Sequence, residues 1–481
     1  MSFYRHGVTV TELPTSLTPP VTSTAGLPVV IGTAPLNLAS DAAPVNQPVL
    51  VNSFAEAVAA FGFNEDFATY TLCEFMSSHF KLFASSPAVL INVLDPNVHK
   101  VSVTGESLQL IGGEKTIEVS GLLKDSLLVS LEEFGSSLLE GQDYKLTWTS
   151  EGFLKIERFK TGAIESDNAN LILNYLKLNP TQVQVSDIVS AIDTVEQVFP
   201  RFRLVPGLLL APSWSANPEV AAPLAAKAEN INGMFKAMAL IDIPVTGMSA
   251  VTKHTEVAAY KNNSVPQSAH VVACWPKVRL GTQEYFLSTQ VAGVIARTDA
   301  KNSGIPFVSP SNNSLQNDSA ITGTESSAKE VTLGPDLAAY LNGNGIVSAL
   351  NFVGGWVLWG NRTSVYPASS DPIDAFIAVR RMMNWINNNL ILSFWQKVDD
   401  PMNRNLIESV VDSANIWLNG LAARGAILGG RCEFRPEENP ITSLMDGIIR
   451  VHLYVTPPSP AREIEFMVEY DPQYLATLAG E

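Results

Sequence analysis

Residues 380–434 have the sequence RRMMNWINNNLILSFWQKVDDPMNRNLIESVVDSANIWLNGLAARGAILGGRCEF, and they lie in the stretch that decides the fold, residues 371–471. Two long helices are predicted here, one beginning at Asp371-Pro372 and one at Asp400-Pro401. An aspartate N-cap accepts the unpaired N–H groups of the first turn, and proline fits the first helical position. Gly425 is the residue expected just after the second helix. Apolar residues recur at spacings of three and four, which is typical of a packed helix face: Phe376, Val379, Met383, Ile386 and Leu390 in the first helix, and Ile407, Val410, Ala414, Trp417 and Leu421 in the second.

Two strands are predicted after these helices, because apolar and polar residues alternate there with a period of two. The first runs from Gly447 to Thr456, and the second runs from Arg462 to Tyr470 behind a proline-rich tether. A terminal strand on such a tether can pair with another subunit, and main-chain hydrogen bonds then form the joint. Periodicity alone favours an ordinary helix-plus-sheet subdomain.

The composition bounds the class of protein. A chain of 481 residues predicts two to four domains, and a hydrophobic content of 46% predicts extensive buried surface, including subunit interfaces. The net charge of -16 argues against sequence-independent binding of nucleic acid and against adhesion to anionic membranes. Cys73, Cys274 and Cys432 are far apart and are expected to be buried free thiols. The N-terminus has no signal-peptide pattern and no run is long enough to span a bilayer, so a soluble protein is expected.

No constellation of catalytic residues stands out. The chain has no phosphate-binding loop, no HExxH and no GxSxG pattern, and its six histidines show no metal-ligand spacing. Catalytic, cofactor-binding and metal sites are therefore not expected. Asp399-Asp400 is interpreted as helix capping before Pro401. The basic pair Arg380-Arg381 fits either a solvated face or contact with an acidic partner.

The rest of the chain predicts a mixed α/β fold in several domains. Residues 29–98 and 190–360 alternate buried strands with helices, which indicates a discontinuous α/β core. Residues 99–189 have short alternating stretches and turn glycines, which predict an inserted β-rich outer domain. Residues 1–28 form a proline- and threonine-rich N-terminal arm with a short strand, and residues 361–481 form a C-terminal domain that ends in a strand arm.

Several segments together resemble contractile tail sheath proteins of myophages and R-type bacteriocins. The resemblance rests on residues 380–434 with the strand pair after them, and it covers most of the chain outside the insertion. The other matching segments are NQPVLVNSFAEAVAAFG (46–62), APSWSANPEVAAPLAAKAEN (211–230), GIPFVSPSNNSL (304–315) and LNGNGIVSALNFVGGWVLWGNRT (341–363).

The resemblance implies a structural protein and not an enzyme. Its copies are expected to form a sixfold helical homo-polymer around an inner tail tube protein, and to contract so that the tube is driven through a target cell envelope. Baseplate and tail terminator proteins are the other partners implied; nucleic acid and direct membrane insertion are not expected. The product is expected to be a virion tail or a phage-free tailocin particle, assembled in the bacterial host cytoplasm. The alternative from another class is an α/β enzyme with a β-rich insertion.

The resemblance also implies roles for particular residues. Strand arms are expected to join subunits around a receiving strand, and a cluster of cations is expected to face the tube. The arm residues are Val8, Thr9, Val10, Thr11 and Glu12 at the N-terminus, and Ile464, Glu465, Phe466, Met467, Val468, Glu469 and Tyr470 at the C-terminus. The receiving residues are Ile449, Val451, Leu453 and Val455, and the candidate tube-facing residues are Arg380, Arg381, Lys397 and Arg404.

Overall fold

A computed structural model describes residues 25–133, 135–149, 151–323 and 327–479. Its main body is built on an eight-stranded sheet of order β18-β17-β12-β11-β10-β1-β3-β2. Strands β17 to β3 in this order run parallel, and β18 and β2 are antiparallel to their neighbours at the two edges. The mixed α/β class is therefore confirmed. The strands are β1 Pro28–Gly32, β2 Val49–Val51, β3 Ala88–Asn92, β10 Leu208–Leu210, β11 Met238–Asp242, β12 Val271–Cys274, β17 Ile346–Asn351 and β18 Trp356–Trp359.

Helices cover the main sheet, so its central strands are buried on both faces and their sequences are apolar except for Asn92 and Asp242 at two strand ends. Ser53 accepts a hydrogen bond from the Glu56 N–H at the start of α1, and Asn217 caps α5 ahead of Pro218. The helices are α1 Phe54–Phe61, α2 Thr71–Met76, a π-helix Ser77–Leu82, α3 Val185–Asp193, α4 Val198–Phe202, α5 Pro218–Glu229, α6 His254–Ser264, α7 Leu287–Lys301 and α8 Pro335–Asn342. A small sheet of order β14-β13-β15-β16 lies beside them, with strands Gln283–Tyr285, Lys277–Leu280, Ser319–Thr322 and Lys329–Glu330.

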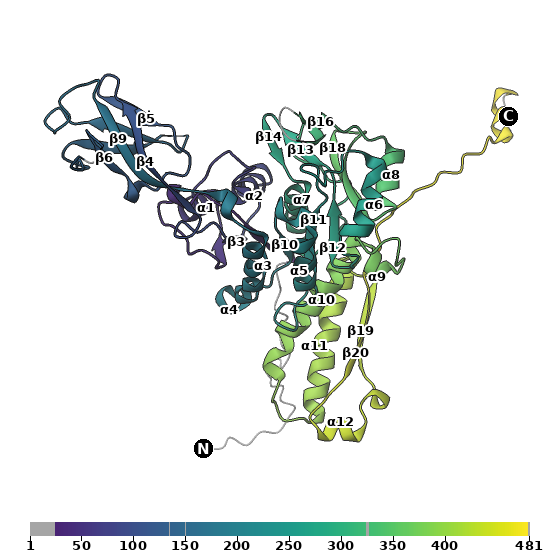
Figure 1. Cartoon of the computed structure of the whole chain (residues 1–481). Helices are drawn as coiled ribbons and strands as arrows, with labels where there is room; N and C mark the ends of the chain where they lie inside the picture. Colours follow the sequence, from purple (N-terminus) through teal and green to yellow (C-terminus); the bar gives the residue numbers. More distant parts are fainter. Residues whose placement is uncertain (1–24, 134, 150, 324–326, 480–481) are drawn as a thin grey trace, which may run out of the picture.

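The segment between β3 and α3 forms a lobe that projects to one side of the main body (Figure 1). It holds two three-stranded sheets, β4-β9-β6 and β5-β8-β7, around a separate apolar cluster that includes Ile117, Val129 and Leu173. Tyr144–Trp148 and the strand after it pair as an antiparallel hairpin, β7 and β8. The strands are β4 Lys100–Gln109, β5 Glu114–Ile117, β6 Leu128–Ser130, β7 Tyr144–Trp148, β8 Leu154–Arg158 and β9 Asn170–Leu178.

The structure moves the second boundary of this insertion. The predicted boundary at residue 189 cuts α3 in two, but Ile188, Ala191 and Ile192 of α3 are all buried in the core of the main body. Entry and exit of the lobe lie side by side, because Lys100 at the start of β4 pairs with Leu178 at the end of β9. The lobe is therefore residues 100–178.

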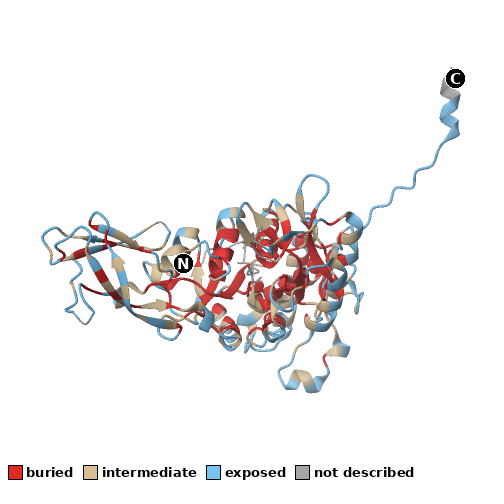
Figure 2. Cartoon of the chain, turned by 45° about the horizontal axis from the view of Figure 1, so that its top comes forward, coloured by how far each residue is buried: buried red, intermediate tan, exposed pale blue. Residues whose placement is uncertain are grey.

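The C-terminal part extends from the main body as two long helices and a hairpin (Figure 1). Its elements are α9 Pro372–Ala375, α10 Ile377–Phe394, α11 Arg404–Ala423, β19 Gly429–Phe434, α12 Ile441–Met445 and β20 Val451–Thr456. Both long helices contribute to one apolar cluster, in which the rings of Trp385 and Trp417 lie 5.7 Å apart. A 3-10 helix, η10 Pro472–Ala479, follows a long extended segment that leaves the body, and this segment is exposed from Ala461 to Asp471 (Figure 2).

The predicted ends of these elements are partly wrong. Asp371 does cap a helix, with its Oδ1 2.9 Å from the Ile373 nitrogen, but that helix stops at Phe376, whose backbone is extended, and α10 begins anew. The second helix is capped by Asn403, whose Oδ1 accepts from the Leu406 N–H at 2.9 Å, and not by Asp400. Asp399 has φ +71°, which is outside the helical region. Gly425 has φ +72°, as expected for the residue after a helix.

Candidate inter-subunit joint

The candidate joint is built on the antiparallel pair β19–β20. The register runs from Gly429 opposite Thr456 to Phe434 opposite Val451. Val451, Leu453 and Val455 pack against the apolar cluster of α10 and α11, so three of the four predicted receiving residues share one half-buried face. Ile449 lies before the strand, which begins only at Val451. The Asn439 side chain bonds both the N–H and the C=O of Arg450, so these groups do not pair with β19 and the strand begins at the next residue, Val451.

One edge of this sheet is closed by α11. The Asn415 side chain accepts from the Cys432 N–H at 2.8 Å and donates to the Cys432 carbonyl at 2.9 Å. An asparagine amide has the donor and acceptor of a peptide group, so Asn415 occupies the place of a neighbouring strand in the middle of β19. A strand from another chain is thereby kept from pairing at Cys432.

The other edge, that of β20, faces outward. In an antiparallel pair, residues alternate between bonding the partner strand and pointing away from it. The main-chain N–H and C=O of Cys432 point away from β20, because they bond Asn415. Leu453 is the register partner of Cys432, so its main-chain groups point away from β19. By the same alternation the N–H and C=O groups of Val451 and Val455 point outward too. Outward main-chain groups of this kind are a template for an added strand.

The C-terminal segment carries an unburied row of apolar side chains. Residues 457–471 form no strand within the single chain, and they run away from the body. The exposed fraction is 83% for Phe466 and 93% for Val468, and Ile464, Met467 and Tyr470 are similarly exposed. Contiguous apolar surface of this kind marks a contact site on a soluble protein. The predicted N-terminal arm strand, Val8 to Glu12, lies outside the described residues.

The four candidate tube-facing cations have different surroundings. Arg381 is wrong as a candidate: it is only 3% exposed, and it binds both carboxylate oxygens of Asp299 as well as the Ala25 carbonyl. Arg380 is largely buried against Asp374, at 3.0 Å. Burial lowers the pKa of Arg380, although Asp374 opposes this effect. Lys397 lies 3.4 Å from Asp400, and Arg404 is mostly exposed beside Glu408. Only Lys397 and Arg404 remain available to a partner.

Two buried carboxyl groups at the start of α7 were not predicted. Glu74 accepts hydrogen bonds from the Phe286 N–H at 2.6 Å and from the Thr289 hydroxyl at 2.9 Å. Asp242 accepts from the Ser288 N–H and hydroxyl. Burial raises the pKa of Glu74 to about 8 and that of Asp242 to about 6. Because these groups satisfy the first turn of a buried helix, their role is structural.

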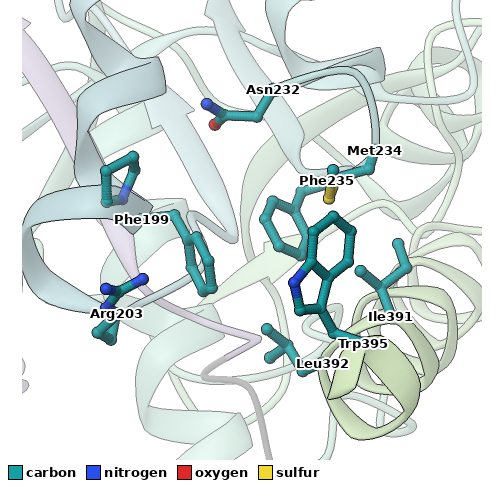
Figure 3. A pocket seen from close by; sticks show the side chains of 9 residues that line it. Phe199, Arg203, Asn232, Met234, Phe235, Ile391, Leu392 and Trp395 are labelled. Atoms are coloured by element: carbon teal, nitrogen blue, oxygen red, sulfur yellow. The ribbon is translucent and has the colours of Figure 1, made fainter. Parts of the chain in front are cut away.

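Two apolar grooves flank the C-terminal helices. The first has a volume of about 520 Å³ and lies where Phe199 and Phe235 of the main body meet Trp395 at the end of α10 (Figure 3). The second, called here the hairpin groove, has a volume of about 630 Å³. It is lined by Met402, Asn403, Arg404, Ile407, Glu408, Val411, Asp412, Phe434 and Leu444.

Neither a metal cluster nor a membrane span is found in the described part of the chain. No group of three or more His, Cys, Asp or Glu side chains in it could hold a metal ion. None of its helices is both long and apolar enough to cross a membrane. All three cysteines are buried and free, as expected.

No family model matches the chain, but individual proteins do. It is 28% identical to the tail sheath protein of Burkholderia phage BcepMu over 494 aligned positions, which cover 99% of each chain. It is 27% identical to a prophage major tail sheath protein of Pseudomonas aeruginosa, over 57% of this chain and 67% of that one.

Solved structures show the same fold. A chain of the anti-feeding prophage baseplate superposes with a TM-score of 0.58 at 15% identity, covering 98% of this chain and 100% of its own length. The contracted helical sheath of the anti-feeding prophage gives 0.57 at 16% identity, with 97% and 99% covered. The fold is thus one found in contractile particles. Together with the full-length sequence similarity, it confirms the resemblance to sheath proteins of contractile tails and contractile injection systems.

Proposed function

We propose that copies of this chain polymerise as sixfold rings around an inner tube, and that their repacking into a shorter, wider sheath drives the tube through a cell envelope. The observation that carries the proposal is the pairing of two unsatisfied features in one chain: an outward edge on β20 and an exposed, alternating C-terminal segment. The open edge of β20 needs an added strand, and the C-terminal segment needs a strand to pair with. The two do not meet within one chain. Heterologous contacts of this kind generate open helical assemblies.

The joint is proposed to be a shared sheet. Ile464 to Tyr470 of one copy adds a strand next to β20, and Val8 to Glu12 of another adds a strand outside that one. About five residues on each side supply several main-chain hydrogen bonds, each worth about 0.5–1.5 kcal/mol net. One joint is modest in strength, but repetition through a lattice makes it strong, while the proline-rich tethers allow subunits to rotate as rigid bodies.

The energy for contraction is proposed to be stored in the extended lattice, and the chain to have no catalytic activity. An inner tube protein, a baseplate and a tail terminator are the proposed partners. Assembly in a bacterial cytoplasm into a virion tail is proposed, with a phage-free particle as the alternative. Electron microscopy of the source particle distinguishes the two, because a capsid is either attached or absent.

The experiment that tests the function replaces Phe466 and Met467 together with proline. Successive N–H groups point to opposite edges of a strand, so the pair removes a donor facing β20 whichever residue faces it. Ala461→Pro, in the already proline-rich tether, is the matched control. The double variant is expected to give a folded monomer by circular dichroism and no polymer by negative stain, whereas the control polymerises. Deletion of residues 1–13 is expected to abolish polymerisation as well. Full-length contractile sheaths from either arm variant would refute the shared sheet.

Lys397 and Arg404 are the proposed contacts with the tube, since Arg404 projects from the N-terminal end of α11 and its ion pair with Glu408 is too exposed to hold it firmly. Reversing both charges, Lys397→Glu with Arg404→Glu, is expected to weaken co-purification of tube with sheath at low salt and to leave the subunit folded. A contact of this kind is salt-sensitive in the wild type. Co-purification that responds neither to salt nor to the reversal removes these residues from the interface.

A further inference from the structure

We propose that the final helix of one copy, η10, docks in the hairpin groove of a neighbouring copy, and that the C-terminal arm therefore runs antiparallel to β20. The inference rests on the proposed function, because it needs the arm of one subunit to lie on β20 of another. It names the second contact of that joint.

The hairpin groove lies at one end of the β19–β20 sheet. Phe434, which lines it, is the last residue of β19 and pairs with Val451, the first residue of β20. Ile407 and Val411, one turn apart on α11, form one wall, and Leu444 of α12 forms another. Two further apolar side chains of α12, Ile441 and Met445, are exposed nearby, so this end of the hairpin presents an apolar surface around the groove.

The final helix begins directly where the proposed arm strand ends. Asp471 follows Tyr470, and its side chain accepts from the Gln473 N–H at 2.9 Å, which starts the helix at Pro472. Tyr474 and Leu475 in its first turn are 75% and 51% exposed. Two large side chains are therefore held just beyond the strand, in a helix that lies away from the described main body (Figure 1).

The direction of the arm follows from where these side chains arrive. In the antiparallel arrangement, Tyr470 ends beside Val451, and the helix continues past the sheet end at which Phe434 lines the groove. In the parallel arrangement, Tyr470 ends beside Thr456 and Leu428, at the opposite end, and the helix continues away from the groove. The two ends of β20 are about 17 Å apart at 3.3 Å per residue. Only the antiparallel arm brings Tyr474 and Leu475 to the groove.

A docked helix fixes the pairing register, which the arm strand alone does not fix. Both faces of the arm are exposed in the free subunit, so the pairing register on β20 is weakly specified and can slip by two residues. A pair of bulky side chains in a groove at one end fixes the register. Every subunit is then held at the same place along β20, as a regular lattice requires.

The test uses two singly substituted proteins that are mixed and assembled: one carries Leu475→Cys, and the other carries Leu444→Cys in the groove. Leu428→Cys, at the far end of the hairpin and 73% exposed, is the matched alternative position for the cross-link. Mixing two proteins ensures that a disulfide joins different copies, and the native cysteines are buried. After mild oxidation of assembled sheaths, covalent dimers are expected for Leu475→Cys with Leu444→Cys and not with Leu428→Cys.

The other outcomes overturn the inference. Dimers with Leu428→Cys show a parallel arm. Intact sheaths without either cross-link show that another group fills the groove. Truncation after Asp471 gives a second measurement: sheaths still form, because the strand is kept, but they dissociate at lower urea concentration than the wild type. Equal urea resistance contradicts docking. If the wild type itself fails to form sheaths, the proposed function fails, and this result differs from every one above.

Discussion

At the scale of single residues, Glu74 and Asp242 are two groups that make the stability of the main body fall as pH rises. The Glu74 carboxyl is buried at the start of α7, and burial raises its pKa to about 8. The folded state therefore holds a proton on Glu74 more tightly than the unfolded chain does. The stability that comes from this difference is fully present below the unfolded pKa, near 4.5, and is lost as pH rises through about 8. The raised pKa of Asp242 contributes stability in the same way, and this contribution is lost as pH rises through about 6.

Glu74→Gln is expected to reduce the loss of stability between about pH 5 and pH 8, by about 2–4 kcal/mol, because a glutamine accepts the same hydrogen bonds without titrating. Thermal unfolding at both pH values measures the effect. Glu330→Gln, at an exposed position of β16, is the matched control and leaves the wild-type pH dependence in place. Equal pH dependence in Glu74→Gln and the wild type shows that Glu74 is ionised at no cost in the folded protein.

At the scale of elements, asparagine side chains complete main-chain pairing at Lys236, Arg450 and Cys432. Asn388 on α10 bonds both the N–H and the C=O of Lys236, at the entrance to β11. Asn439 does the same for Arg450 and Asn415 for Cys432. Each contact joins segments that are distant from one another in the sequence or in the hairpin. In this way α10 is held on the main sheet, and β19 is closed on the edge that faces α11.

Asn415→Ala is expected to destabilise the C-terminal hairpin by about 1–3 kcal/mol, since the N–H and C=O of Cys432 lose their partner. Hydrogen exchange followed by mass spectrometry measures this as faster exchange in the peptide that contains Cys432. Asn419→Ala, one turn later on the same helix and exposed, is the control and leaves the exchange unchanged. Slow exchange in both variants means that a different group protects β19.

At the scale of the whole molecule, the β-rich lobe projects from the main body and has an apolar cluster of its own. Its apolar cluster is distinct from that of the main body, and its two connections meet in the β4–β9 pair, where the Asn179 N–H donates to the His99 carbonyl. We propose that it lies at the outer radius of the sheath, because it projects away from both the C-terminal helices and the hairpin (Figure 1).

Replacement of residues 101–177 by a short Gly/Ser bridge is expected to leave a soluble core that still polymerises. Leu178 is kept because it is buried in the main core, and α3 is kept because it packs there as well. Size-exclusion chromatography and negative stain measure solubility and polymer formation. An insoluble product, or a folded monomer that never polymerises, places the lobe in the core or in the subunit contacts instead.

The sequence by itself determined the features that depend on neighbours along the chain. Period-two and helical patterns predict the buried strands and the long helices, because burial on one face repeats at a spacing set by local geometry. The cap at Asp371 and the turn at Gly425 were predicted for the same reason, since the groups involved lie within four residues of one another.

The tertiary structure alone decided the features that depend on distant partners. Arg381 is buried because Asp299, 82 residues away, supplies its counter-charge. One edge of the hairpin is closed because α11 brings Asn415 to Cys432. The α3 helix belongs to the main body because an apolar surface is there to cover it. A periodic pattern shows that a face is buried, but it does not identify the partner that covers it, because that partner is brought near only when the chain folds.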